Sequence, residues 1–142
     1  MQSYDPFDED SRCHDVLGVE LAERIRAAGA GIGAFYTPTA FGTRLAEGKE
    51  TRRFGDRDYV LETPIHADYA LIKADRADRW GNLTYRMSAR NFAPIMASAA
   101  KCSVVQVREI VELGGIDPEA VVTPGIFVKR VVKVAATLRK AA

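Results

Sequence analysis

Residues 68–73, Asp68-Tyr69-Ala70-Leu71-Ile72-Lys73, form a short apolar run between charged residues, a pattern typical of a central strand. A second run, residues 103–107, is β-branched and apolar and predicts another strand. Residues 92–100 between them predict a short helix, with Asn91 as its cap and Pro94 in its first turn. Strands separated by helices or long connections indicate an α/β domain with an open, mostly parallel sheet flanked by helices.

The segment upstream of these strands has a helical pattern followed by strand patterns. Residues 19–28 place their apolar side chains on one face and predict a helix that Gly29 closes as a C′ glycine. Residues 30–37 predict a short buried strand. Residues 51–54 and 58–61 flank a glycine turn and predict a hairpin.

Composition narrows the class of protein. The chain has 142 residues, of which 47% are apolar, enough for one core of ordinary size. A net charge of +1 argues against a nucleic-acid-binding protein or a polybasic membrane protein, and no apolar run approaches the ~20 residues that span a bilayer. Two cysteines and two histidines make neither a disulfide framework nor a spaced zinc site. We therefore expect a cytoplasmic protein with no metal.

Charge is uneven along the chain and suggests three regions. Residues 1–18 are acidic and lack apolar periodicity, so they predict a disordered tail. Residues 19–134 carry the strand and helix patterns and form the domain. Residues 135–142 are rich in alanine, lysine and arginine and predict a basic C-terminal extension.

Two stretches are candidates for ligand binding. Phe35, Thr37 and Thr39 lie at the end of a predicted strand, where ligands collect in open α/β sheets, although threonines also stabilise turns locally. Arg90 and Asn91 precede a predicted helix, where a guanidinium and an amide can hold a carboxylate. The alternative for the second pair is an asparagine cap beside a surface arginine.

A resemblance to a known family rests on stretches that occur in family order and with family-like spacing. They are residues 21–35, 37–39 with Gly42-Thr43, 46–50, 59–62, 77–83, 89–97 and 122–128. Together they resemble the A subunit of the 3-oxoacid coenzyme A transferases, from about Val19 to Val134. Gly33 and Arg79-Trp80-Gly81-Asn82 resemble the 3-oxoadipate:succinyl-CoA branch, and relatives that use acetoacetate or acetate stay open as alternatives.

The resemblance implies transfer of CoA from succinyl-CoA to a 3-oxo acid such as 3-oxoadipate. In that family the glutamate that attacks the thioester and forms a glutamyl-CoA intermediate belongs to a separate B subunit. No glutamate of this sequence lies in the Glu-Asn-Gly or Glu-Ser-Gly setting of that nucleophile. The resemblance therefore implies a B-subunit partner in a hetero-oligomer, no catalytic residue in this chain and no cofactor, since the CoA thioester is itself a substrate. Phe35, Thr37, Thr39, Arg90 and Asn91 would then line the substrate pocket.

The sequence also departs from the family pattern. Complete A subunits carry an upstream half with a glycine-rich loop, which residues 1–18 do not contain, and Ala40 stands where a glycine is usual. We therefore expect the C-terminal part of the family domain, with an exposed strand edge and apolar face. Such a chain would be poorly soluble or oligomeric. A non-catalytic module that binds a B subunit is the second hypothesis, and a sugar-phosphate isomerase on the same architecture is a weaker third.

Overall fold

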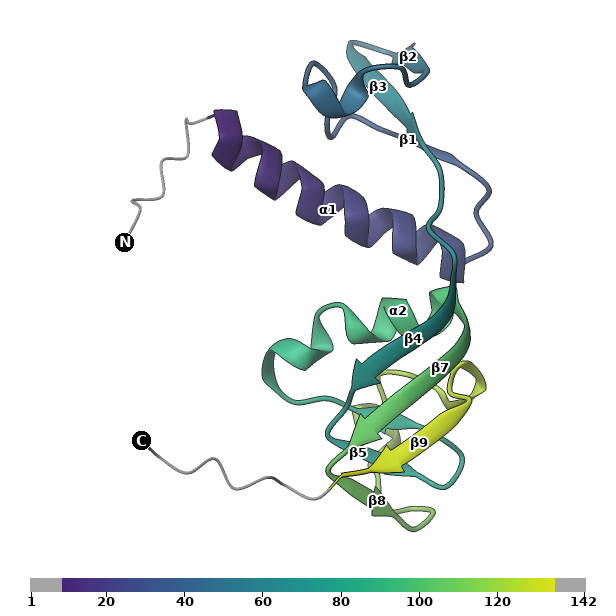
Figure 1. Ribbon diagram of the computed structural model, residues 1–142. Coiled ribbons are helices and arrows are strands. Elements are labelled where there is room, and N and C mark those ends of the chain that lie inside the picture. The colour runs from purple at the N-terminus through teal and green to yellow at the C-terminus, as the bar shows by residue number, and fades with distance from the viewer. Residues whose placement is uncertain (1–8, 135–142) are drawn as a thin grey trace, which may run out of the picture. The chain divides into compact units, whose positions relative to one another are not determined.

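The computed structural model describes residues 9–134, which divide into two compact units at the Ile65–His66 boundary (Figure 1). The first unit contains the helix α1 (Glu9–Gly29) and a three-stranded antiparallel sheet. The second contains three parallel strands, a short helix and a second small sheet. Each unit is described by itself.

The helix α1 is longer at both ends than the pattern over residues 19–28 predicts. It begins at Glu9, so the part of the expected tail from that residue onward is helical, whereas residues 1–8 lie outside the described residues. At the other end Gly31, with φ of +71°, occupies the left-handed position predicted for Gly29. The Ile32 amide donates to the Ala27 carbonyl and the Gly31 amide to that of Ala28, the hydrogen-bond pattern of a Schellman cap.

The sheet of the first unit has the order β1-β3-β2 and is antiparallel throughout. The strands β2 (Thr51–Phe54) and β3 (Arg57–Glu62) form the predicted hairpin, which turns at Gly55 with φ of +62°. The strand β1 (Phe35–Thr37) is much shorter than the predicted segment 30–37 and is half-buried. Residues 30–34 do not join it, because the end of α1 and its cap occupy the chain up to Ile32.

The second unit confirms the predicted parallel sheet. The strands β4 (Ala67–Lys73), β7 (Ala100–Val107) and β9 (Arg130–Lys133) run parallel in the order β4-β7-β9. The helix α2 (Ala93–Ala99) connects the first two and packs against both. The buried cluster contains Ala70, Ile72, Leu83, Ala97, Val105 and Val107 among others.

A smaller sheet of order β6-β5-β8 completes the second unit. It consists of β5 (Arg76–Asp78), β6 (Leu83–Thr84) and β8 (Glu109–Val111). Within the described residues, 3-10 turns link strands in both units: Arg44–Ala46, Met87–Arg90, Pro118–Ala120 and Gly125–Phe127. Residues 135–142, the predicted basic extension, lie outside the described residues.

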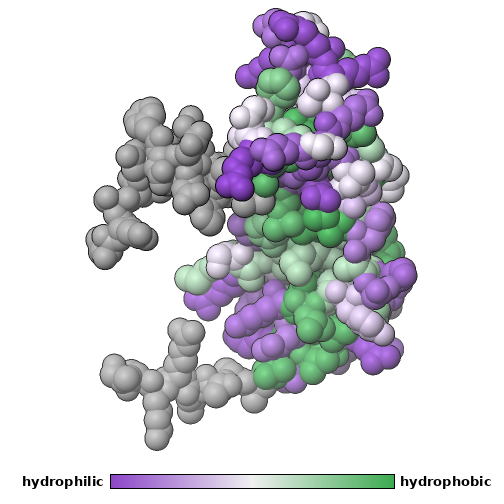
Figure 2. All heavy atoms as spheres, turned by 45° about the horizontal axis from the view of Figure 1, so that its top comes forward, coloured by the Kyte–Doolittle hydropathy of each residue, from purple (hydrophilic) through white to green (hydrophobic). Residues whose placement is uncertain are grey.

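One face of β4 leaves apolar side chains in solvent. Tyr69 is 70% exposed and Leu71 76%, whereas Ala70 and Ile72 are buried. Alternate strand residues point to opposite faces of a sheet, so Tyr69 and Leu71 share the uncovered face. The space-filling view shows apolar side chains at the surface among hydrophilic ones (Figure 2). Two apolar side chains of β4 are therefore uncovered within the second unit, and β4 lies at the edge of its sheet.

Candidate functional site

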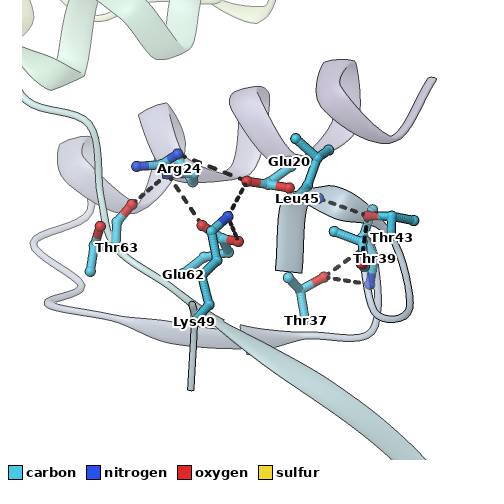
Figure 3. A network of polar contacts seen from close by, with 10 residues as sticks. Glu20, Arg24, Thr37, Thr39, Thr43, Leu45, Lys49, Glu62 and Thr63 are labelled. Atoms are coloured by element: carbon cyan, nitrogen blue, oxygen red, sulfur yellow. Dashed lines mark hydrogen bonds and ion pairs between the residues drawn. The ribbon is translucent and has the colours of Figure 1, made fainter. Parts of the chain in front are cut away.

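The predicted threonine site is a locally bonded turn. Thr37 donates its hydroxyl to Thr39 Oγ1 over 2.9 Å, and the Thr39 amide donates back to Thr37 Oγ1 over 3.2 Å (Figure 3). The Thr43 hydroxyl donates to the Ala40 carbonyl and accepts the Leu45 amide, which caps the following 3-10 turn. The threonine hydroxyls therefore make hydrogen bonds within their own turn, which is the alternative to ligand binding noted for them.

The same loop contains a residue in a strained backbone conformation, Ala40, which is also a departure from the expected sequence pattern. Ala40 has φ of +76° and is 4% exposed. An alanine in the left-handed region carries a conformational penalty that glycine does not. Phe35 pairs with Glu62 across β1 and β3 at the start of this loop. The structure places Phe35, Thr37 and Thr39 in the first unit, within a five-residue segment.

The two most buried polar side chains of the first unit, Glu20 and Glu62, belong to a four-residue ion cluster with two partly exposed cations. Lys49 Nζ lies 2.6 Å from Glu62 Oε1 and 3.2 Å from Glu20 Oε1. Arg24 flanks both carboxylates, with Nε 3.6 Å from Glu62 and a terminal nitrogen 3.8 Å from Glu20. Figure 3 shows the four side chains converging between α1 and the strand β3.

Charge balance gives this cluster a structural role. Glu20 is 5% exposed and Glu62 2%, so their two charges need the two cations beside them. Burial lowers the pKa of Lys49, but hydrogen bonds to Glu62 and Glu20 outweigh that effect, and the net pKa is raised. Lys49 therefore stays protonated, and both glutamates act as ion-pair partners that join α1 to β3.

The second unit holds two adjoining cavities at the carboxyl end of β4. One, of about 260 Å³, is lined by Leu71, Ile72, Lys73, Ser88, Ala89, Asn91, Phe92, Ala93 and Met96. The other, of about 290 Å³, is lined by Lys73, Ala74, Asp75, Arg86, Met87, Ala89 and Arg108. Both contain Lys73, the last residue of β4, so they meet at the strand end where parallel sheets gather ligands.

The charge of these cavities favours an anion. Arg108 is engaged by Asp75, with Nε 3.1 Å from Oδ1. Lys73 and Arg86 are exposed, and neither forms an ion pair within residues 18–134. These two cations beside the Asn91 amide suit a carboxylate ligand. Lys73 and Arg86 are absent from the predicted site, although Lys73 ends the central strand that the sequence identifies.

Of the second predicted pair, Arg90 and Asn91, only Asn91 lines one of these cavities, the one that Leu71 and Phe92 also line. Asn91 lines it, whereas Arg90 is exposed at the end of the preceding 3-10 turn and is not among the lining residues. The prediction that Asn91 caps the helix α2 is wrong: Phe92 occupies the N-cap, with no side-chain hydrogen bond. A 3-10 turn spans Met87–Arg90 just before the helix, and Asn91 is the C-cap of that turn.

Two of the chain's four cysteine and histidine side chains, Cys102 and His66, are among those that the structure describes. Cys102 is a free, half-buried thiol on β7. The side chains of Cys13 and His14 lie outside those described. Among the described residues no three His, Cys, Asp or Glu side chains cluster as metal ligands would. Within the same part of the chain, no helix has both the length and the hydropathy to cross a membrane.

Comparisons of the sequence with known proteins match most of the chain to one family. The family model described as coenzyme A transferase matches residues 9–134. The A subunit of 3-oxoadipate CoA-transferase from Pseudomonas putida is 68% identical over 114 residues, 80% of this chain and 49% of that protein. The protein of the same name from Acinetobacter baylyi is 65% identical over 122 residues, 86% and 54% of the two chains.

A solved structure extends the likeness to the fold. Glutaconate coenzyme A-transferase from Acidaminococcus fermentans superposes with a TM-score of 0.71 at 20% identity, over 81% of this chain and 43% of that one. The chain spans about half the length of the curated relatives it matches. Since the family model matches most of the sequence and the fold agrees, the chain belongs to the coenzyme A transferase family.

Proposed function

We propose that the chain contributes the A-subunit part of an enzyme that moves CoA from succinyl-CoA to a 3-oxo acid, with 3-oxoadipate as the first candidate. The observation that carries the proposal is the identity of 65–68% to two proteins named as A subunits of 3-oxoadipate CoA-transferase. The cationic cavities at the end of β4 support it. A dicarboxylate such as 3-oxoadipate has a second carboxylate that Lys73 and Arg86 can hold.

The proposed chemistry takes its nucleophile from a B subunit. A glutamate carboxylate oxygen attacks the thioester carbonyl and the CoA thiolate leaves, which gives a mixed anhydride. The thiolate then attacks the glutamyl carbonyl and releases succinate, leaving a glutamyl-CoA thioester. The 3-oxo acid carboxylate accepts CoA by the reverse sequence. Among the described glutamates, the two most buried, Glu20 and Glu62, are held by Lys49 and Arg24, which supports a nucleophile from elsewhere.

Within this proposal the two predicted groups of residues have separate parts. Lys73 and Asn91 hold the acid substrate at the end of β4, with Arg86 and the exposed Arg90 adding positive charge near the entrance. Phe35, Thr37 and Thr39 form a shaped loop in the first unit, in which the aromatic side chain provides an apolar wall. The hydroxyls of Thr37 and Thr39 act mainly on each other.

The test is exchange of CoA in a reconstituted complex. The full chain is mixed with the B subunit of a related transferase, and formation of the 3-oxoacyl-CoA from succinyl-CoA is followed. Lys73→Gln should raise KM for 3-oxoadipate about tenfold and leave KM for succinyl-CoA less changed, because it removes one charged contact. Lys101→Gln is the matched control, since Lys101 is exposed, pairs with Asp68 and lies outside both cavities.

The outcomes separate the alternatives. An equal loss with 3-oxoadipate and acetoacetate would contradict a role for Lys73 in holding the second carboxylate. Binding of the B subunit without exchange would favour the non-catalytic module, which the exposed face of Tyr69 and Leu71 also suits. Arg90→Ala should likewise raise KM for the acid, and unchanged kinetic constants would remove Arg90 from the site.

A further inference from the structure

Two residues other than glycine adopt a left-handed backbone conformation within residues 9–134. They are Ala40, with φ of +76°, and Met87, with φ of +55°. A side chain in this region carries a conformational penalty that glycine does not. Ala40 is 4% exposed, so its packing can offset the penalty, whereas Met87 is 82% exposed and gains no such compensation. Backbone strain that packing does not explain points to a role in function.

Met87 begins a 3-10 turn that contributes to both cavities at the carboxyl end of β4. Arg86 and Met87 line one cavity, Ser88 lines the other, and Ala89 lines both. Figure 1 shows the helix α2, which follows this turn, beside β4. The left-handed residue thus lies where the chain passes from one cavity to the other. Glycine would make the same turn without the penalty, so the backbone alone does not account for a methionine here.

The side chain of Met87 gives its cavity an apolar component. The described lining residues of this cavity, which has a volume of about 290 Å³, are three cations, one acid, two alanines and Met87. Asp75 engages Arg108, which leaves Lys73 and Arg86 as the cations that form no ion pair within residues 18–134. Met87 is thus the one large apolar side chain among the described lining residues. A ligand that matches this lining has a carboxylate for the cations and a hydrocarbon segment for the thioether.

We propose that Met87 is a specificity-determining residue of the acid site, whose thioether contacts the methylene chain of a dicarboxylate held by Lys73 and Arg86. The inference rests on the proposed function, because that function makes this cavity the site of the acid substrate. Each methylene group that moves from water onto an apolar surface is worth up to about fourfold in affinity. Met87 therefore favours longer diacids over shorter ones, and its unbranched side chain adapts to the shape of the chain it contacts.

The experiment measures binding of diacids to the full chain without turnover. The longer diacid adipate, the shorter diacid succinate and neutral adipamide are titrated separately, and the backbone amide NMR signal of Ala89, which lines both cavities, reports binding. Carbon-13 labelling of the methionine methyl groups reports on Met87 directly. We expect a saturable shift of the Met87 methyl signal, about fivefold higher affinity for adipate than for succinate, and about tenfold weaker binding of adipamide. Equal affinities for the two diacids, an unchanged Met87 signal at saturation, or adipamide binding as tightly as adipate would each overturn the proposal.

Three variants separate contact with the acid from a structural role of Met87. Met87→Ala removes the thioether and should reduce the preference for adipate to less than about twofold, whereas Met87→Leu keeps an apolar side chain and should retain the preference. Met87→Gly should also lose the preference, and it should unfold at a higher urea concentration than Met87→Ala, since glycine adopts a positive φ without strain. A structural role predicts the reverse, with stability lost in Met87→Ala and Met87→Gly and the preference unchanged, and that result would overturn the proposal.

Ile126→Ala is the matched control, because Ile126 is a 76% exposed apolar side chain in another 3-10 turn and lines neither cavity. It should leave both dissociation constants unchanged within about twofold, and an equal loss of preference in this variant would overturn the role of Met87. Diacid binding is measured without a B subunit. A preference for adipate without CoA exchange in the reconstituted complex would support the role of Met87 and contradict the transferase activity. Exchange by a chain that shows no preference would overturn the role of Met87 alone.

Discussion

The ammonium group of Lys49 lies 2.6 Å from Oε1 of Glu62, whose side chain is only 2% exposed. The same ammonium lies 3.2 Å from Glu20 on α1, so one cation is shared by two buried carboxylates. Arg24 supplies the second positive charge and also donates from Nε to the Thr63 carbonyl over 2.7 Å. These contacts join the helix α1 to the end of β3 within the first unit.

Replacement of Lys49 should destabilise the first unit. Lys49→Met leaves Glu20 and Glu62 buried with Arg24 alone, and an uncompensated buried charge is costly. Because the Lys49 side chain keeps 30% exposure, we expect a loss of about 2–4 kcal/mol in the free energy of unfolding. Urea denaturation of the full chain measures it. Lys101→Gln removes an exposed ion pair with Asp68 and should leave the urea midpoint of unfolding unchanged.

The free energy of unfolding should also depend on pH through the ionisation of Lys49. Hydrogen bonds to Glu62 and Glu20 raise the pKa of Lys49 above its ordinary value of 10.5 despite the opposing effect of burial. A raised pKa in the folded state means that the stabilisation is complete below about pH 10.5 and is lost as the pH rises through the folded pKa. We expect wild type to lose stability there more steeply than Lys49→Met. Parallel curves for the two proteins as the pH rises through that range would contradict this account.

The elements that the sequence predicts well are those set by local pattern. The hairpin follows from its turn glycine, Gly55, and the strands β4 and β7 follow from their short apolar runs. The end of α1 shows the limit of this reasoning. Gly29 and Gly31 are both suited to a cap, and only the hydrogen bonds of Ala27 and Ala28 select Gly31.

Long-range pairings account for most of what the sequence does not predict at the candidate sites. Lys49 and Glu62 are 13 residues apart, and their contact depends on how β3 packs against α1. Asn91 is suited to capping a helix, but the 3-10 turn before it shifts the helix start to Ala93. Lys73 gains its place in two cavities because it ends β4, which no single-residue pattern reveals.

Gly125 should be intolerant of any side chain. A Cβ there would lie 2.0 Å from the Trp80 carbonyl oxygen and 3.2 Å from the Gly81 carbonyl carbon, both in the backbone of the turn after β5. Gly125→Ala should cost about 3 kcal/mol or more, at the upper end of overpacking effects. Differential scanning calorimetry of the full chain measures the loss.

Gly33→Ala is the control for this substitution. No atom lies within 4 Å of the added Cβ, and its φ is outside the left-handed region. Reduced freedom of the unfolded chain should leave it neutral or more stable by up to about 1 kcal/mol. Similar losses at Gly33 and Gly125 would show that close backbone packing at the Trp80 turn is not the cause.

The uncovered face of β4 should drive self-association. Leu71 is 76% exposed beside Tyr69 on an edge strand, a combination that favours pairing with a second copy. Leu71→Glu should shift the sedimentation coefficient toward that of the monomer, because a charge on this face opposes its burial. Ile126→Glu makes the same chemical change at a side chain that is also 76% exposed but lies in a 3-10 turn, and it should leave the distribution unchanged. A wild-type chain that sediments as a single monomeric species at all concentrations would contradict the role assigned to Leu71.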